Sequence, residues 1–453
     1  MKLRFSWLNS RKSLIFASLF DFSLFFFLFF DKFRYPILNE SILLFLAIID
    51  SLIWVISSYI FGRYAFKAFE KFNIFITQFI KTIFIVFLNI LFTQILFRIF
   101  WDWNYMNFES FSNYLNDLSN FYIRVFILSG LSQSLAGLYF SKKNTKYSIW
   151  FFLGNNNSAQ YLKKLIGKKS KFKIKTFNQK YLLNNELKAQ GIIIDDEKIL
   201  AKKNIQFLFD LNNKGMKFMK ISNWCERYLN RYPPELVKVS DIIGGKFSYD
   251  ENSLKARIKR IYESILSLFI LILTFPIILC ASLLIKFEDG GPIFYTQCRN
   301  GFEGKKFKII KLRTMIINAE KKGAQWADQS DSRITKIGRI LRKLRIDELP
   351  QLLLVLSGEM SLIGPRPERP TIDNLLRESI PNYDLRYSIK PGISGWAQVN
   401  YPYGASINDS KYKLSYDIYY IKNFSILLDC MIFFKTLRLV INGKGSVPVK
   451  NSK

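Results

Sequence analysis

The chain has 453 residues, 49% of them hydrophobic, and its 66 Lys and Arg against 35 Asp and Glu give a net charge of +31. Its long Phe-rich apolar runs cannot be solvated as a nucleic-acid surface, so the basic balance indicates membrane lipids and phosphorylated partners, with no nucleic acid. The sequence contains no histidine, which excludes imidazole bases, Ser-His-Asp triads and histidine zinc sites. Its four cysteines are far apart and indicate neither a disulfide framework nor a thiolate metal site.

Four apolar stretches, at about 13–30, 41–62, 74–99 and 120–140, each have the ~20 residues that a membrane-spanning helix needs. Lys and Arg gather before the first stretch, after the second and after the fourth, which places these sides in the cytoplasm. The first stretch has no small-residue cleavage site, so we expect it to be retained as an anchor. The sequence therefore predicts a four-helix transmembrane region over residues 1–145.

Two acids lie inside the apolar stretches, Asp21 in the first and Asp50 in the second. An acid within the membrane is a candidate functional site. A buried pairing with Lys81 or Arg124, or a polar contact between helices, explains them as well, and the sequence leaves their role open.

The pattern changes over residues 146–250, where short apolar strands alternate with helical stretches. This alternation predicts a parallel sheet and a Rossmann-like α/β domain. Its first turn, GNNNSA after the strand that ends at Gly154, lacks the second and third glycines of a dinucleotide site. We therefore assign no ligand to this domain, which can serve packing or regulation.

A further uncharged stretch, Ser264–Ile285, is long enough to cross a bilayer. Pro276 lies in its middle, where it removes a helical hydrogen bond, and both flanks are basic, which favours two cytoplasmic ends. We predict a re-entrant helix kinked at Pro276. A straight fifth span is the alternative, since membrane helices tolerate proline.

The next segment has the signature of a β-hairpin, with a Gly-Gly-Pro turn, the strand IFYTQ, a glycine turn and the strand KFKIIKL. Arg299, Lys311 and Arg313 lie on or beside these strands. We predict that they bind substrate.

From about Lys255 to Gly445 the chain resembles the bacterial sugar transferases, the polyprenyl-phosphate sugar-1-phosphate transferases that start exopolysaccharide and O-antigen repeat units. The resemblance rests on five blocks in the family's order: GPIFYTQCRNG, FKIIKLRTM, RIDELPQLLLVLSGEMSLIGPRPE, KPGISGWAQVNYPYG and YDIYYIKNFSILLD. The long, multi-span members look most similar.

This resemblance implies a monotopic α/β catalytic domain over residues 251–453, in the cytoplasm at the bacterial inner membrane. It implies transfer of a sugar 1-phosphate from a UDP-sugar to undecaprenyl phosphate, with release of UMP and a need for Mg²⁺. The family's catalytic and metal-binding acid pair falls on Asp347 and Glu348, and its phosphate-binding arginine on Arg342. The sugar is not readable from the sequence, and homo-oligomer formation is left open.

The local sequence around the acid pair is compatible with these roles. Pro350 fits only the first turn of a helix, so a helix starts near Asp347 and Glu348 with its positive end facing them. We expect a carboxylate at that end to keep a low pKa, which suits a nucleophile or a Mg²⁺ ligand. Taken alone, the motif favours a structural role, with an N-cap at Asp347 and a first-turn charge at Glu348. The surrounding family blocks favour catalysis.

Positive charge accompanies the acids. Arg342, with Lys343 and Arg345, offers the charge that a diphosphate and its transition state require. Arg366 lies between two prolines in GPRPE and is predicted either to bind substrate phosphate or to shape the site.

The aromatic side chains of the glycine-rich loop, Trp396, Tyr401 and Tyr403, are expected to anchor at the membrane surface, and lining the nucleotide pocket is the alternative.

Two other classes of function make different predictions for this sequence. A non-enzymatic membrane scaffold would release no UMP and would tolerate Asp347→Asn. A nucleotide-sugar glycosyltransferase with a D-x-D metal motif is the enzymatic rival, but the sequence contains no D-x-D. The family resemblance therefore implies a membrane phosphosugar transferase, and with its acid pair we expect the reaction to pass through a covalent aspartyl intermediate.

Overall fold

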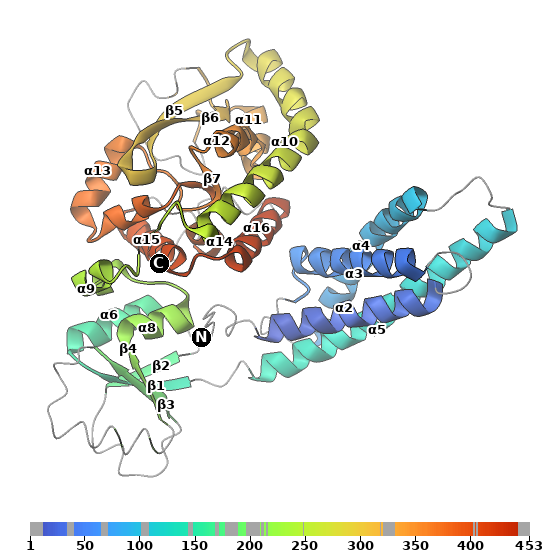
Figure 1. Cartoon of the computed structure of the whole chain (residues 1–453), viewed down its shortest axis with the longest axis horizontal. Helices are drawn as coiled ribbons and strands as arrows, with labels where there is room; N and C mark the ends of the chain where they lie inside the picture. Colours follow the sequence, from blue (N-terminus) through green and yellow to red (C-terminus); the bar gives the residue numbers. More distant parts are fainter. Residues whose placement is uncertain are drawn as a thin grey trace. The chain divides into compact units, whose positions relative to one another are not determined.

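The structure of the chain is a computed structural model (Figure 1). It describes residues 12–33, 40–64, 71–100, 108–143, 148–167, 172–176, 189–195, 209, 213, 216–247, 249–317, 319, 331–401, 404 and 406–442. Contacts divide it into two compact units, a first that ends at Lys220 and a second that begins at Ile221.

Four long helices begin the first unit: α2 (Lys12–Phe33), α3 (Glu40–Ile60), α4 (Lys71–Phe100) and α5 (Phe108–Lys143). Phe25, Trp54 and Phe121 form part of their buried interior, with the ring of Phe25 5.2 Å from Trp54 and 5.1 Å edge-on from Phe121. Within the described residues, five helices are long and apolar enough to cross a membrane, these four and α10 of the second unit. The chain is a membrane protein, and the four predicted apolar helices are confirmed as helices.

The two acids of this helix bundle are fully buried. The Asp21 carboxylate pairs with Arg63 Nη1 at 3.1 Å, and Arg63 also donates to the hydroxyl of Ser129. Asp50 accepts a hydrogen bond from the Thr93 hydroxyl at 2.6 Å. Buried pairing thus accounts for Asp21, with Arg63 in place of the two cations that we predicted, while a polar contact between helices accounts for Asp50.

The first unit also contains the predicted parallel sheet. Its strands are β1 (Ser148–Leu153), β2 (Phe172–Thr176), β3 (Ala189–Ile194) and β4 (Lys217–Lys220), all parallel, in the order β2-β1-β3-β4. Helix α6 (Asn156–Ile166) follows β1 and is capped by Asn155. A Cβ on Gly154 would lie 2.4 Å from Cβ of Asp195, so this glycine permits the close approach of β1 and β3. Its role is therefore explained by packing.

The second unit opens with short elements that pack on its C-terminal part. They are α8 (Ile221–Trp224), the short π-helix η4 (Cys225–Leu229), the 3₁₀-helix η5 (Pro234–Leu236) and α9 (Val239–Ile243). Trp396 Nε1 donates to the Asn230 carbonyl at 2.9 Å, and Tyr232 N donates to the Ser415 carbonyl at 2.7 Å. These contacts join residues from Ile221 to the unit that contains the predicted catalytic segment, whereas the sequence set the domain boundary at 250/251.

A long helix, an antiparallel hairpin and a short parallel strand pair organise the rest of this unit. The helix is α10 (Leu254–Asp289), the hairpin is β5 (Phe294–Asn300) with β6 (Lys306–Leu312), and the pair is β7 (Ser361–Ile363) with β8 (Gly392–Ser394). The remaining elements are η6 (Phe302–Gly304), α11 (Lys336–Leu344), η7 (Ile346–Gln351), α12 (Leu352–Ser357), α13 (Pro370–Ser379), η8 (Tyr383–Ser388), α14 (Trp396–Asn400), α15 (Ile407–Asn423) and α16 (Ile426–Ile441). The predicted hairpin is confirmed.

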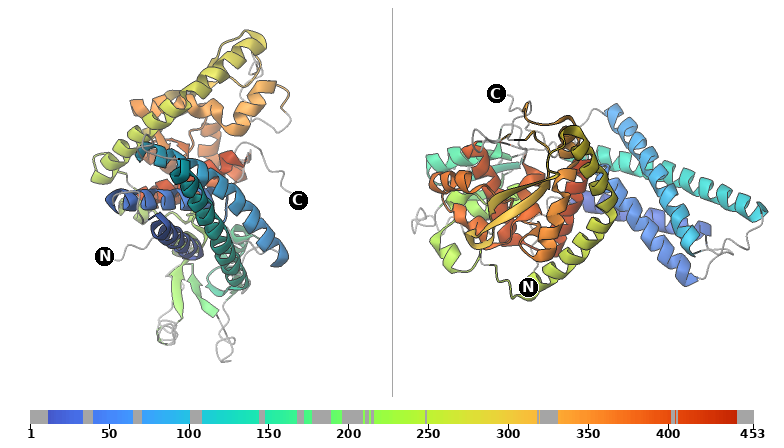
Figure 2. Two further views of the ribbon diagram at one scale, coloured as in Figure 1. Left: turned by 90° about the vertical axis from the view of Figure 1, so that its right-hand side faces the viewer. Right: turned by 90° about the horizontal axis from the view of Figure 1, so that it is seen from above.

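Helix α10 continues through Pro276, and its axis changes direction along its length (Figures 1 and 2). Its first half is held by a buried ion network, in which Lys259 Nζ lies 2.8 Å from Glu263 and 2.6 Å from Asp429 of α16. Lys259 also donates to the Ile363 carbonyl at the end of β7.

The far end of α10 packs on the same unit. Ala281 and Ile285 form a buried cluster with Leu312 of β6 and Leu341 of α11. Between the two ends the helix exposes large apolar side chains, including Phe269, Ile272, Leu273 and Phe275.

Replacing Lys259 by Met should strongly destabilise the second unit, because Glu263 and Asp429 would stay buried without their cation. Breaking a buried ion pair in this way costs about 3–5 kcal/mol. Thermal unfolding of the detergent-solubilised full chain measures the loss. The exposed pair of Lys305 with Glu303 provides the control, since Lys305→Met should leave the melting temperature unchanged. Equal melting temperatures for Lys259→Met and the parent chain would contradict the assigned role.

Candidate active site

The acid pair lies where one helix turns sharply into the next. Helix α11 ends at Leu344, and Arg345 takes a left-handed conformation with φ of 55° and ψ of 25°. Asp347 and Glu348 then occupy the first turn of η7, which contains Pro350 and continues into α12. The prediction that a helix begins at the acid pair is confirmed.

Glu348 is buried and is surrounded by three cations from three places in the chain. Its Oε1 lies 3.2 Å from Lys311 Nζ of β6 and 2.6 Å from Arg366 Nη2 of the GPRPE loop, and its Oε2 pairs with Arg345. Burial alone would raise the pKa of Glu348, but Arg345, Arg366 and Lys311 hold it well below its usual range. Glu348 is therefore an ionised centre whose two oxygens are already engaged.

Asp347 has the opposite environment. It is buried, and among the residues that the structure describes none donates a hydrogen bond to its carboxylate. Burial and the neighbouring Glu348 raise the pKa of Asp347 to about 6, against the opposing effect of Lys311, Arg345 and Arg342. Our expectation of a low pKa is correct for Glu348 and wrong for Asp347, because loss of solvation outweighs the helix end. Asp347 is the more basic and less engaged of the two acids.

The other predicted site residues divide into two groups. Arg342 is partly exposed in the last turn of α11 and lowers the pKa of Asp347 electrostatically. Burial lowers the pKa of Lys311 to about 8, so this amine lies in a poorly solvated position. The structure thus gathers Arg342, Lys311 and Arg366 around the acid pair.

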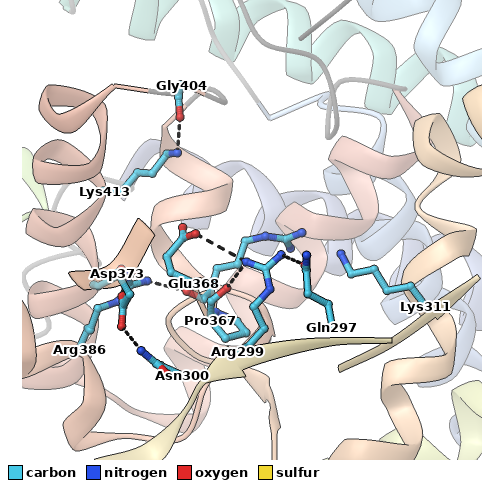
Figure 3. A network of polar contacts seen from close by, with 12 residues as sticks. Gln297, Arg299, Asn300, Lys311, Pro367, Glu368, Asp373, Arg386, Gly404 and Lys413 are labelled. Carbon is cyan, nitrogen blue, oxygen red and sulfur yellow. Dashed lines mark hydrogen bonds and ion pairs between the residues drawn. The ribbon is translucent and has the colours of Figure 1, made fainter. Parts of the chain in front are cut away.

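Two residues that we predicted to bind substrate, Arg313 and Arg299, form contacts with the protein itself. Arg313 pairs with Asp289, its Nη1 lying 2.8 Å from Oδ2, and so fastens the hairpin to the end of α10. Arg299 donates to the Pro367 carbonyl at 3.2 Å and to Gln297 at 2.7 Å (Figure 3). Their predicted contact with substrate stays a prediction.

The aromatic loop differs from our expectation. Trp396 is buried, donates to the Asn230 carbonyl and stacks on Tyr419, so it is a packing residue and not a membrane anchor. Tyr401 stacks on Tyr412 and donates to Asp409 at 2.8 Å. Tyr403 lies outside the described residues.

The two acids of the site differ in whether they could ligate the magnesium ion that the family resemblance implies. In the described parts of the chain no three acidic, histidine or cysteine side chains cluster as a metal site. Glu348 is a poor metal ligand here because three cations occupy its oxygens. The Asp347 carboxylate accepts no hydrogen bond within the described part of the chain and suits an ion that is shared with phosphate oxygens. Mg²⁺ commonly binds through one or two carboxylates together with phosphate oxygens and water. Asp347 therefore fits such an ion, and Glu348 does not.

Residues 254–443 match the family model described as bacterial sugar transferase. The chain is 40% identical over 192 residues to the uncharacterized sugar transferase EpsL of Bacillus subtilis, which covers 42% of this chain and 89% of the relative. The chain belongs to the bacterial sugar transferase family.

Longer members of this family match over a smaller share of their length. Identity is 43% over 220 residues with the UDP-N-acetylgalactosamine-undecaprenyl-phosphate N-acetylgalactosaminephosphotransferase of Aeromonas hydrophila, covering 46% of this chain and 52% of the relative. It is 37% over 182 residues with the UDP-glucose:undecaprenyl-phosphate glucose-1-phosphate transferase of Escherichia coli, covering 40% and 39%. The match thus spans about half or less of these two relatives.

The raised pKa of Asp347 predicts that Asp347→Asn stabilises the protein at neutral pH. The pKa in the folded chain lies above the ordinary value of 3.8, so ionised Asp347 destabilises the fold. This penalty is complete above about pH 6 and disappears as the pH falls toward 4. Asn should therefore add ~1–3 kcal/mol near pH 8 and nothing near pH 4.

Thermal unfolding of the full chain in metal-free buffer across this pH range measures the difference. Asp331, whose pKa is lowered by its hydrogen bonds to Arg333, provides a control of opposite sign. Asp331→Asn should destabilise the chain at neutral pH. A loss of stability in Asp347→Asn near pH 8 would show that the carboxylate has a stabilising partner.

Proposed function

We propose that this chain transfers a sugar 1-phosphate from a UDP-sugar to undecaprenyl phosphate, releasing UMP and forming undecaprenyl-diphosphate-sugar, the first step of a surface polysaccharide. The names of the Aeromonas hydrophila and Escherichia coli relatives supply the substrate class. The observation that carries the proposal is the contrast within the acid pair: Asp347 accepts no hydrogen bond from the described residues, while Glu348 holds three cations in place.

The reaction we propose has two displacements at one phosphorus atom. An Asp347 oxygen attacks the sugar-bearing phosphorus, a new P–O bond forms, and the bond to the bridging oxygen breaks so that UMP leaves with the electron pair. An oxygen of undecaprenyl phosphate then attacks the same phosphorus and displaces the Asp347 carboxylate. No proton transfer is required in either step, which agrees with a chain that lacks histidine.

In this reaction the cations of the site would bind the diphosphate and neutralise its negative charge. Lys311 and Arg366 reach Glu348 from a strand and a loop, and their ammonium and guanidinium groups offer donors to the oxygens of the diphosphate. Arg342 adds positive charge beside Asp347. Magnesium, when bound, would supply further neutralisation of the phosphate charge, with Asp347 as its protein ligand.

Helix α10 is proposed to enter the membrane and return to the cytoplasmic face. Lys259 near its start and Ile285 near its end both pack on one unit, while a straight span would place its ends on opposite sides of ~30 Å of hydrocarbon. The exposed apolar middle and Pro276 agree with insertion and a bend. The catalytic unit then lies in the cytoplasm at the inner membrane, and the parallel sheet of the first unit is a Rossmann-like module without an assigned ligand.

The covalent step predicts UMP formation before the lipid acceptor binds. Purified full chain should release UMP from UDP-N-acetylgalactosamine or UDP-glucose in an amount equal to the enzyme, and a label in the β-phosphate should stay on the protein. Adding undecaprenyl phosphate should discharge this label and start turnover. Asp347→Asn should lower turnover at least 10³-fold while it stays folded. Near-native turnover of Asp347→Asn, or no UMP without acceptor, would rule out the aspartyl intermediate.

The re-entrant helix predicts one-sided labelling. In a variant whose four native cysteines are replaced by serine, cysteines at the exposed positions Lys255 and Lys308 should react with a membrane-impermeant thiol reagent only from the cytoplasmic side. A cysteine at Glu40, at the start of α3, should react only from the opposite side. This control shows that the reagent has access to that side of the membrane. Labelling of Lys308→Cys from outside would establish a straight span.

A further inference from the structure

The GPRPE loop that carries Arg366 is held by its backbone carbonyls. Prolines 365 and 367 have no N–H groups, so the loop cannot stabilise itself with a ladder of hydrogen bonds. Four consecutive carbonyls accept hydrogen bonds from other elements: Pro365 from Gly392 N (2.9 Å), Arg366 from Arg386 Nη2 (2.5 Å), Pro367 from Arg299 Nη1 (3.2 Å) and Glu368 from Asn300 N (3.1 Å). The direction of the Arg366 side chain therefore depends on donors outside the loop.

Arg386 provides the bond to Arg366 itself. Its side chain is only 9% exposed; Nη1 donates to the Tyr383 hydroxyl, and Nη2 also lies 3.8 Å from Asp417. Both terminal nitrogens are thus engaged with the protein. The buried guanidinium therefore acts on the loop and is largely shielded from solvent.

Asp373 links two of the four donors (Figure 3). It is buried, and its Oδ2 accepts from Asn300 Nδ2 at 2.5 Å while its Oδ1 accepts from the Tyr383 hydroxyl at 2.8 Å. Asn300 holds the Glu368 carbonyl, and Tyr383 holds Arg386. One buried carboxylate is thereby linked to the donors that hold the Arg366 and Glu368 carbonyls.

We propose that Arg386 is a positioning residue for phosphosugar transfer: it acts through the Arg366 carbonyl to direct the Arg366 guanidinium at the acid pair, with Asp373 and Tyr383 holding it in place. The inference rests on the proposed function. It predicts that a change at Arg386 affects the reaction only while Arg366 is present, because Arg386 itself touches no substrate.

A double-mutant cycle on the full chain tests this dependence. Arg386→Lys keeps the charge but cannot bridge Tyr383 and the Arg366 carbonyl, and it should lower kcat/KM by roughly 10- to 100-fold, the effect of a displaced catalytic group. In an Arg366→Lys background the same exchange should lower it by less than about 2-fold. Equal effects in both backgrounds would overturn the proposal, since a merely structural role lowers activity independently of Arg366.

The assay uses undecaprenyl phosphate in liposomes with UDP-N-acetylgalactosamine or UDP-glucose, whichever the parent chain accepts. If Arg386→Lys does not fold, Tyr383→Phe takes its place in the cycle, because it removes only the hydroxyl that joins Asp373 to Arg386. Arg377→Lys, on an exposed arginine paired with Asp384, is the matched control and should leave kcat/KM unchanged.

Failure of the parent chain to release UMP from either donor would refute the proposed function. An active parent chain with an additive cycle would refute the positioning role alone.

Discussion

The buried ammonium of Lys259 connects helix α10 to the elements that carry the candidate site. It lies between Glu263 of its own helix and Asp429 of α16, and it also donates to the carbonyl of Ile363. Ile363 ends β7, and the next residue begins the GPRPE loop. Because a charge buried without its partners is strongly unfavourable, α10, β7 and α16 are fixed together. The position of the GPRPE loop relative to α10 follows from this arrangement.

The same electrostatic principle separates two adjacent acids of similar chemistry. Three cations stabilise the ionised form of Glu348 and lower its pKa. Asp347, the preceding residue, is buried and accepts no hydrogen bond from the described residues. Their environments therefore push the two pKa values apart, which is how one site assigns different roles to two carboxylates. The left-handed backbone of Arg345 contributes, because it turns the chain from α11 into η7 while its side chain returns to Glu348.

Local patterns predicted the features that depend on neighbouring residues. Apolar runs predicted four helices, turn chemistry predicted the β5–β6 hairpin, and Pro350 predicted the helix start at the acid pair. Features that depend on distant residues were missed or wrong: the raised pKa of Asp347, the burial of Trp396 against Asn230, and the pairing of Arg313 with Asp289. Arg386 lies 20 residues after Arg366, and nothing in the local sequence indicates that they meet.

In a site that binds phosphate, an acid such as Glu348 repels the negative charge of the ligand, yet its contacts give it a physical role. Lys311 is poorly solvated, and the positive charge of Arg366 acts against its ammonium and lowers its pKa further. Glu348 offsets that repulsion and keeps both side chains pointing at one place. Donors that are already oriented need little reorganisation when phosphate charge develops, and such preorganisation is a large part of electrostatic catalysis. In the proposed reaction Glu348 would therefore act through the cations it holds, and Asp347 would be the reactive carboxylate.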